Sequence, residues 1–280
     1  GYTATKEEFV TGAPLPITDA IIHPDDGAMY FTIGGRRVQS GLYRVTYVGK
    51  ESTALVQAKP KTTKSRDTRH MLEAFHGKQD PRAVKTAWPY LEDSDRLIRW
   101  AARMAIEHQP TETWADQALS DSNPATQVEA LLALARVTGV CPQHRDNQSG
   151  PVDLEMRGKL LAALLAVDPS KLNHAQKLTL YRTLQITLVR FGRPDNATVS
   201  SLIEKFDPLF PADTFEQNWL LCETLAWLES PTVATRAMDL IETAVTQEEQ
   251  LQYARSLRML KAGWTTELRT RYFSWFLKAA

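Results

Sequence analysis

Cysteine is scarce in this sequence, with only Cys141 and Cys222 among 280 residues. Two thiols exclude a disulfide framework and a four-thiolate metal site. Glycine is also infrequent, at 13 residues, and 43% of the residues are hydrophobic, which excludes collagen and an intrinsically disordered chain. No apolar run approaches the roughly 20 residues of a membrane-spanning helix. We therefore predict a globular chain with one large core or two modest ones.

Neither sign of charge is in excess, because 33 Lys and Arg residues balance 33 Asp and Glu residues. This balance excludes a globally basic nucleic-acid-binding protein, although it leaves local patches open. The sequence also lacks a phosphate-binding P-loop, a nucleophile elbow and a His-Glu-x-x-His zinc motif. Cys141 and His144 have the spacing of one metal chelate, but zinc needs three or four ligands. We predict neither a catalytic centre nor a metal site in this chain.

The first 58 residues carry most of the strand signals. Apolar residues alternate over 41–48 as in a half-buried strand, with one face made by Tyr43, Val45 and Tyr47. Two further strands are indicated by the β-forming residues 28–33 and by the apolar run 20–22, with a Pro- and Gly-containing turn between them. We predict a β-strand segment over 1–58, in which residues 14–57 form an antiparallel meander. It needs a covering neighbour, because an isolated meander exposes one face and two edges.

The structural class changes after residue 58. Residues 59–69 are polar and basic and contain Pro60, so we interpret them as a linker. Over residues 70–280 the apolar positions recur with helical period, which predicts at least eight helices. The apolar stripes include Leu97, Ile98, Ala101, Ala102 and Ala105, then Val128, Leu131, Leu132 and Ala135, and then Leu160, Leu161, Leu164 and Leu165.

Pairs of a capping residue and a proline mark several of the predicted helix starts. Asp80-Pro81, Asn123-Pro124 and Asp168-Pro169 lie 43 and 45 residues apart, close to the roughly 40 to 47 residues of a two-helix HEAT unit. Further starts are predicted at Ser230-Pro231 and at the capping boxes that begin with Thr214 and Thr246, and stops are predicted at Gly139, Gly192 and Gly263. We predict a mainly α fold, a HEAT-like α-α solenoid preceded by a short antiparallel β meander, with its helices packed as consecutive antiparallel pairs.

Two stretches of the chain resemble a known family. The first is Thr-Asp-Ala-Ile-Ile-His-Pro-Asp-Asp-Gly-Ala-Met-Tyr-Phe-Thr-Ile-Gly-Gly-Arg-Arg at 18–37, followed by Gln-Ser-Gly-Leu-Tyr-Arg-Val-Thr-Tyr at 39–47. The second begins with Glu-His-Gln-Pro at 107–110 and runs through Gly-Trp-Thr at 263–265 to Arg-Tyr-Phe-Ser-Trp-Phe at 271–276. Together they resemble the large planctomycete and verrucomicrobial proteins described as PVC-type haem-binding or membrane-bound dehydrogenase-like proteins.

The resemblance implies a signal peptide, a β-propeller similar to soluble quinoprotein sugar dehydrogenases, a HEAT-like helical region and a C-terminal cytochrome c domain. It matches residues 1–58 to the last propeller strands and residues 70–280 to the helical region. Because the chain opens at Gly1 within an apparent β element, we interpret it as a segment of such a polypeptide. The resemblance implies a periplasmic or secreted location, with haem c and a candidate quinone as cofactors of the full-length protein. The Cys-x-x-Cys-His haem motif is absent here, so we expect no cofactor in this segment.

One candidate cofactor site follows a predicted strand, at Gly34, Gly35, Arg36 and Arg37. Two guanidinium groups at a propeller mouth suit the bidentate binding of a carboxylate-rich quinone or an acidic substrate. The alternative is a turn whose glycines adopt positive φ and whose arginines cover the sheet edge. His23 has the same two interpretations, a base on that surface or a loop residue packed at a strand end.

Charge is unevenly distributed along the chain. Residues 36–103 hold 15 Lys and Arg against 7 Asp and Glu, whereas residues 204–249 hold 2 against 10. We expect the basic end to meet an acidic partner or neighbouring domain, with Arg96, Arg99 and Arg103 as interaction residues whose reversal to Glu leaves the helical content unchanged. The alternative is an ordinary solvated surface. We interpret the tryptophans in helical segments as core residues, namely Trp100, Trp219 and Trp275.

Three functions follow from these features. The first is a non-catalytic helical-repeat scaffold in a larger secreted oxidoreductase-like protein, which positions a propeller relative to a cytochrome c domain. The second is a part of the active site of a quinone-dependent sugar or alcohol dehydrogenase. The third is a DNA-binding HEAT-repeat protein of the alkylpurine glycosylase type, which the β segment and the zero net charge disfavour. We expect neighbouring domains or a protein as partner, no membrane, and no nucleic acid.

Overall fold

The computed structural model describes residues 4–54, 62–146 and 148–279. The chain divides into two compact units, Gly1–Lys61 and Thr62–Ala280. The strands lie in the first unit and the α-helices lie in the second. The prediction of a mainly α protein with a short antiparallel β meander at its beginning is therefore confirmed.

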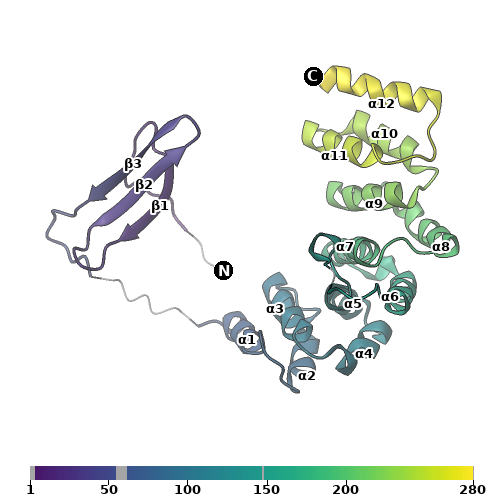
Figure 1. The fold of residues 1–280 in the computed structure, drawn as a ribbon, viewed down its shortest axis with the longest axis horizontal. Coiled ribbons are helices and arrows are strands. Elements are labelled where there is room, and N and C mark those ends of the chain that lie inside the picture. Colours follow the sequence, from purple (N-terminus) through teal and green to yellow (C-terminus); the bar gives the residue numbers. More distant parts are fainter. Residues whose placement is uncertain (1–3, 55–61, 147, 280) are drawn as a thin grey trace. The chain divides into compact units, whose positions relative to one another are not determined.

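The sheet unit has three antiparallel strands in the order β1–β2–β3 (Figure 1). They are β1 Ile17–Ile22, β2 Met29–Gly35 and β3 Val38–Val45. Phe31 is paired with Ala20 on one side and with Tyr43 on the other, so these three side chains share one face. The rings of Phe31 and Tyr43 stack with their centroids 5.1 Å apart.

A carboxylate fixes the turn between β1 and β2. Asp26 accepts a hydrogen bond from the backbone N–H of Ala28, and it also accepts from the Tyr30 hydroxyl and the Arg44 guanidinium, each at 2.9 Å. The bond from Ala28, helped by those from Tyr30 and Arg44, holds the pKa of Asp26 below its usual 3.8. His23 lies at the same turn with its Nδ1 3.5 Å from the Asp26 carboxylate.

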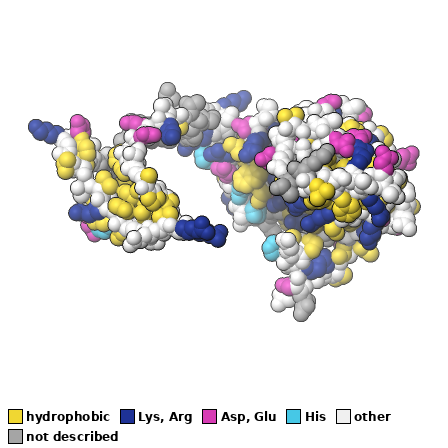
Figure 2. Space-filling view, turned by 90° about the horizontal axis from the view of Figure 1, so that it is seen from above, with side chains coloured by type: hydrophobic (Ala, Val, Ile, Leu, Met, Phe, Trp, Pro, Cys, Tyr) yellow, Lys and Arg dark blue, Asp and Glu magenta, His cyan; other side chains and the backbone are white. Residues whose placement is uncertain are grey.

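Much of the sheet remains exposed within its own unit. Phe31 and Ile33 are buried, but all six residues of β1 are exposed, and so are Leu42 and Tyr43 of β3. Figure 2 shows hydrophobic side chains gathered on this unit. Because a three-stranded sheet of this size is marginally stable when uncovered, the need for a covering neighbour stays a prediction.

The helical unit contains twelve α-helices within its described residues, which confirms the prediction of at least eight (Figure 1). Short 3-10 helices interrupt the series at Trp88–Tyr90, Thr111–Thr113, Pro142–His144, Pro169–Lys171 and Asp207–Leu209. The α-helices are α1 Lys64–Glu73, α2 Ala83–Ala87, α3 Arg96–Glu107, α4 Ala115–Ser120, α5 Pro124–Thr138, α6 Leu154–Ala166, α7 His174–Phe191, α8 Asn196–Phe206, α9 Phe215–Leu228, α10 Val233–Thr243, α11 Gln247–Leu257 and α12 Thr266–Ala279.

The predicted linker over 59–69 ends earlier than expected. Helix α1 begins at Lys64, where the Thr63 hydroxyl accepts from the backbone N–H of Arg66 and caps the helix. Lys64, Arg66 and Arg69 of this segment therefore belong to a helix, and sequence reasoning missed the cap. Residues 59–61 lie outside the described residues.

The predicted helix starts are partly right. Asn123, Thr214 and Thr246 each cap a helix through the side-chain oxygen. By contrast, Asp168-Pro169 begins only a 3-10 turn, and α7 starts later with a capping box of Asn173 and Gln176. Asp80-Pro81 and Ser230-Pro231 lie in turns just before α2 and α10. Of the four pairs of a capping residue and a proline, Asn123-Pro124 begins an α-helix directly, two lie two residues before an α-helix, and one begins a 3-10 turn.

The odd-numbered helices contact one another in series. α1 contacts α3, and the contacts continue through α5, α7 and α9 to α11. A second series consists of α4, α6 and α8, and α10 contacts α12. Each even helix from α2 to α10 also contacts the odd helix that follows it. In Figure 1 the helices accordingly succeed one another from α1 at one end of the unit to α12 at the other.

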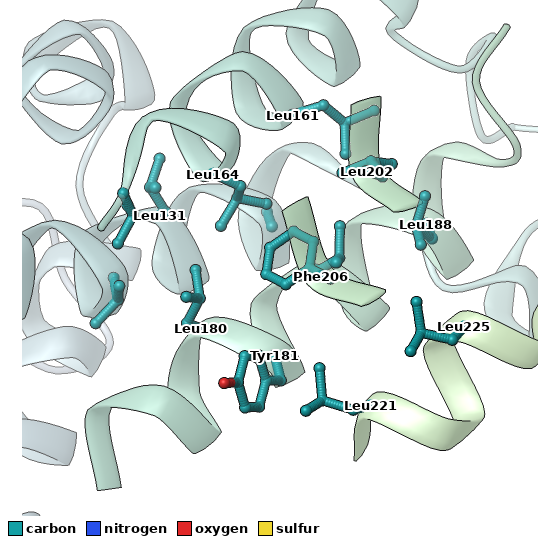
Figure 3. Close-up of a cluster of buried hydrophobic side chains, with 14 of the residues drawn as sticks. Leu131, Leu161, Leu164, Leu180, Tyr181, Leu188, Leu202, Phe206, Leu221 and Leu225 are labelled. Carbon is teal, nitrogen blue, oxygen red and sulfur yellow. The ribbon is translucent and has the colours of Figure 1, made fainter. Parts of the chain in front are cut away.

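The core lies between these two series of helices. Figure 3 shows Leu161 and Leu164 of α6 and Phe206 of α8 in one cluster with Leu131 of α5 and Leu180 of α7. All five side chains are buried. The predicted stripes of α5 and α6 thus face the core. Helix α5 goes further, because every residue from 126 to 135 is buried, as expected of a helix that is apolar and small on most sides.

Cations from neighbouring helices satisfy the carbonyl groups at several helix ends. Arg190 of α7 donates to the carbonyl oxygens of Arg136 and Gly139 at the end of α5, the second at 2.7 Å. In the same way Arg193, just after α7, donates to carbonyls at the end of α9, and Lys205 of α8 donates to carbonyls at the end of α6. The last carbonyls of a helix lack partners within it and favour positive charge, so these bonds tie consecutive helices of one series together.

Among the described residues, no helix is both long and apolar enough to cross a lipid bilayer.

Candidate interaction site

The structure places the candidate cofactor residues in a tight hairpin turn. Gly34 and Gly35 end β2, and Arg36 and Arg37 form the turn that leads into β3. The positive φ that this turn requires, 65°, is adopted by Arg37, so the expectation that the glycines adopt it is wrong. Both arginines are exposed, and within the described part of the chain neither is in an ion pair. Their side chains are thus accessible to a ligand.

The three arginines predicted to form an interaction surface lie on α3 in different surroundings. Arg96 is exposed at the first turn of the helix. Arg99 donates to the carbonyl oxygens of Asp93 and Ser94, at 2.6 and 3.1 Å, and Arg103 points toward α5. The side chains of Arg99 and Arg103 are only 18% and 15% exposed. One arginine of the predicted surface is therefore free to meet a partner, and two belong largely to the fold.

Glu129 of α5 holds these two partly buried arginines. Its side chain is 8% exposed and lies 3.5 Å from Arg99 Nε and 3.2 Å from Arg103 Nη1. The hydroxyl of Thr179 on α7 also donates to it, at 3.4 Å. One carboxylate thus links α3, α5 and α7, and it neutralises one of the two guanidinium charges that face it.

A second carboxylate extends this network. Glu107, at the end of α3, accepts from Arg136 Nε at 2.8 Å and lies 3.3 Å from Arg103 Nε. The expectation that reversal of Arg103 to Glu leaves the helices unchanged is therefore revised. The new carboxylate would lie beside those of Glu107 and Glu129, and the repulsion among the three would weaken the packing of α3 on α5. Reversal of Arg96 alone remains a test of the surface.

A groove of about 590 Å³ lies above this network. Its floor includes Glu129 of α5, and one wall is formed by α7. The other wall is α3, with both apolar and basic side chains. The lining residues are Arg96, Leu97, Arg99, Trp100, Arg103, Glu129, Ala175 and Leu178.

The apolar wall of the groove differs from the sequence prediction. Trp100 was expected in the core with Leu97, but the two are 46% and 45% exposed. Trp219 is also 36% exposed, whereas Trp275 is buried as predicted. On α3 the small residues Ala101, Ala102 and Ala105 face the core instead. These alanines allow α3 to approach its neighbours closely. The indole of Trp100 lies outside the core, where it contacts the His76 ring edge-on at a centroid distance of 5.9 Å.

The groove can therefore offer apolar contact and positive charge at the same place. Three arginines and one glutamate line it, which leaves an excess of two positive charges. The adjoining Glu107–Arg136 pair is neutral as a pair and does not alter that excess. Because Arg99 and Arg103 engage Glu129, this carboxylate is not free to act as a general base, and the arrangement favours binding over acid–base chemistry.

Sequence reasoning missed the residues that complete the groove. Glu129 and Leu178 lie in segments read only as helix, 26 and 75 positions after Arg103. One signal existed for Glu129, a single acidic residue among the apolar residues of α5, where a buried charge requires a partner. The sequence pattern does not indicate which residues pair with Glu129, because Arg99 and Arg103 lie on another helix.

The two cysteines are both unpaired thiols. Cys222 of α9 is fully buried, and burial raises the pKa of its thiol to about 12. Cys141, beside the 3-10 turn that contains His144, is partly exposed. Within the described ranges, no group of three or more His, Cys, Asp and Glu side chains is arranged to hold a metal ion.

No protein-family model matches the chain, and no curated protein or solved structure matches it. The resemblance to the PVC-type haem-binding proteins therefore stays a prediction from the residues that carry it.

Proposed function

We propose that the helical unit is a HEAT-like α-α solenoid and that it acts as a non-catalytic scaffold that binds a protein partner through the α3–α5–α7 groove. The serial contacts among the odd helices support the solenoid, as do the cations that tie α5 to α7 and α7 to α9. The observation that carries the binding function is the groove itself. It is lined by the exposed side chains of Arg96, Leu97 and Trp100 and by the ion pair of Arg103 and Glu129.

The resemblance supports a narrower role for this scaffold. In a secreted oxidoreductase-like polypeptide it would position a propeller, whose last strands are residues 1–58, relative to a cytochrome c domain. The partners are then neighbouring domains of the same polypeptide, while haem c and the quinone belong to those domains. The uneven charge of the chain supports such an arrangement, since its basic and acidic ends can orient oppositely charged neighbours.

Hydrogen exchange on the full chain tests the solenoid. In a solenoid each helix depends chiefly on its neighbours, so a defect at one end stays local. We expect Tyr272→Ala, which removes a buried ring from α12, to accelerate amide exchange in α10–α12 and to leave α3–α7 unchanged. A loss of protection throughout the helical unit would instead indicate one cooperative bundle and overturn the proposal.

Two further measurements test the scaffold. Cross-linking of the full-length protein should join lysines near the groove, such as Lys177, to one neighbouring domain. In parallel, the chain alone is assayed for sugar or alcohol oxidation with an added quinone and a dye acceptor. Turnover by the chain would overturn the non-catalytic role and favour the dehydrogenase alternative, in which Arg36 and Arg37 contribute to the site.

A further inference from the structure

The groove chemistry narrows the class of partner. Resting on the proposed function, we infer that the α3–α5–α7 groove binds an acidic peptide segment that carries at least one aliphatic or aromatic anchor side chain. The segment belongs to a protein partner of this chain. The inference depends on three properties of the described residues, namely an exposed apolar wall, an unpaired arginine and a buried carboxylate in the floor.

The apolar wall accounts for the anchor. Leu97 and Trp100 are almost half exposed on α3, and Leu178 with Ala175 faces them from α7. A tryptophan held this far out of the core has apolar area to bury, and such side chains are the ones that dominate binding energy at protein interfaces. A volume of about 590 Å³ admits a few side chains of a partner, but it does not admit a folded domain.

The charges account for the acidic flanks of the segment. Arg96 is exposed, and no ion pair involves it among the described residues. Beside it, Arg99, Arg103 and Arg136 face the two carboxylates of Glu129 and Glu107, so one positive charge of this network is left without a partner charge. A carboxylate near Arg96 gains both a charge-assisted hydrogen bond and the residual positive field. Opposite charge at the rim and an apolar centre together fit an amphipathic acidic segment.

The same features disfavour a nucleic acid in the groove. Affinity for a phosphate backbone comes from many cations that track successive phosphates. Here only Arg96 is free, and the carboxylate of Glu129 lies in the floor, where it repels a close phosphate. The acidic residues over 204–249 add a repulsive field further along the helical unit. A peptide can carry carboxylates only where they meet the rim of the groove, whereas a nucleic acid carries a negative charge at every nucleotide.

Fluorescence anisotropy with designed probes tests the inference on the full chain. The acidic probe is a fluorescein-labelled peptide of about twelve residues made of Glu, Ala and Leu, with Leu at helical spacing. One matched probe replaces every Glu with Lys, and another replaces every Leu with Ser. We expect the acidic probe with Leu to bind, and both matched probes to bind at least about tenfold more weakly.

Substitutions in the groove then locate the binding. Arg96→Glu leaves the fold intact, because Glu at the first turn of α3 suits the helix dipole. We expect this substitution to weaken binding of the acidic probe about 5- to 10-fold and to restore part of the affinity for the Lys probe. Trp100→Ala should weaken binding of the acidic probe about tenfold. The matched controls are Lys85→Glu on α2 and Phe273→Ala on α12, both exposed and outside the groove, which should change affinity less than about twofold.

Each contrary outcome has a distinct meaning. Equal binding of all three peptides, or equal loss in the control variants, overturns the groove assignment. Tighter binding of duplex DNA than of the acidic probe, weakened by Arg96→Glu, replaces the peptide with a nucleic acid. Self-association that Arg96→Glu abolishes would identify a second copy of the chain as the occupant. In all three cases the exchange experiment with Tyr272→Ala still decides the solenoid, so the two proposals fail separately.

Discussion

The carboxylate of Glu129 offers the sharpest test of how the helical unit is held together. In Glu129→Ala the two guanidinium groups of Arg99 and Arg103 lose their shared partner, and the Thr179 hydroxyl loses its acceptor on another helix. Arg103 keeps only Glu107, which already accepts from Arg136. The substitution should therefore loosen α3 and α7 from α5 at the same time.

The size of the effect follows from burial. Removal of one partner from a fully buried ion pair costs about 3 to 5 kcal/mol, because the remaining charge is left without compensation. The two arginine side chains are 15–18% exposed, so water recovers part of that loss. We expect Glu129→Ala to lower the free energy of unfolding by about 2 to 4 kcal/mol. Glu129→Gln keeps the shape and one acceptor, and it should cost less.

The measurement is urea-induced unfolding followed by circular dichroism, with hydrogen exchange to locate the change. Exchange should accelerate in α3, α5 and α7. Glu155→Ala on α6 is the control, because Glu155 is 79% exposed and its ion pair, among the described residues, is with Lys159 of the same helix. A double-mutant cycle with Arg103→Met isolates the pair. A loss below about 1 kcal/mol for Glu129→Ala, with no coupling to Arg103, would refute the reasoning, since that is the scale of exposed ion pairs.

Three further predictions concern the core, the acid stability and the thiols. Leu164→Ala should cost about 2 to 5 kcal/mol in urea unfolding by leaving a cavity between α6 and its neighbours, and a loss on the scale of surface changes would show that the stripe faces elsewhere. Burial alone raises the pKa of Asp207, but hydrogen bonds from Ser230, Thr232 and Arg236 outweigh it and hold the pKa below 3.8. Its contribution to stability is therefore present above about pH 4 and disappears as the pH falls through the lowered pKa, so Asp207→Asn should flatten the acid limb of the stability curve measured by thermal unfolding. A thiol reagent at pH 8 should modify Cys141 in the native protein and reach Cys222 only after unfolding, because burial keeps Cys222 as a thiol; modification of both at equal rates by mass spectrometry would contradict its burial.

Local patterns in the sequence predict the elements of this protein well. Alternation over 41–48 and the turn before residue 28 predict the meander, because strand geometry and turn chemistry act over a few residues. The bounds and the face of the last strand are wrong, since β3 spans Val38–Val45 and both Tyr43 and Tyr47 are exposed. The caps Asn123 and Thr214 are found for the same reason, since a cap binds the backbone only two or three residues ahead. The error at Asp168-Pro169 arises because this motif also stabilises a 3-10 turn, and the true start of α7 lies five residues later.

The candidate site was predictable only in part. Arg96 could be found from the excess of basic residues over 36–103, and it is exposed as an interaction residue must be. Arg99 and Arg103 come from the same charge cluster but are held by Glu129, which no local pattern could pair with them. The apolar neighbours of Trp100 in the sequence predict a core position for it, yet three alanines of α3 fill that face.

The sequence by itself determined the class of each segment and the starts of several helices, because hydrophobic period, caps and turns are properties of neighbouring residues. Only the tertiary structure decided which charges are solvated and which are buried. Glu129 and Thr179 are 50 positions apart, and they meet because α5 lies between α3 and α7. The groove is a consequence of that packing, since its walls come from two helices and its floor from a third.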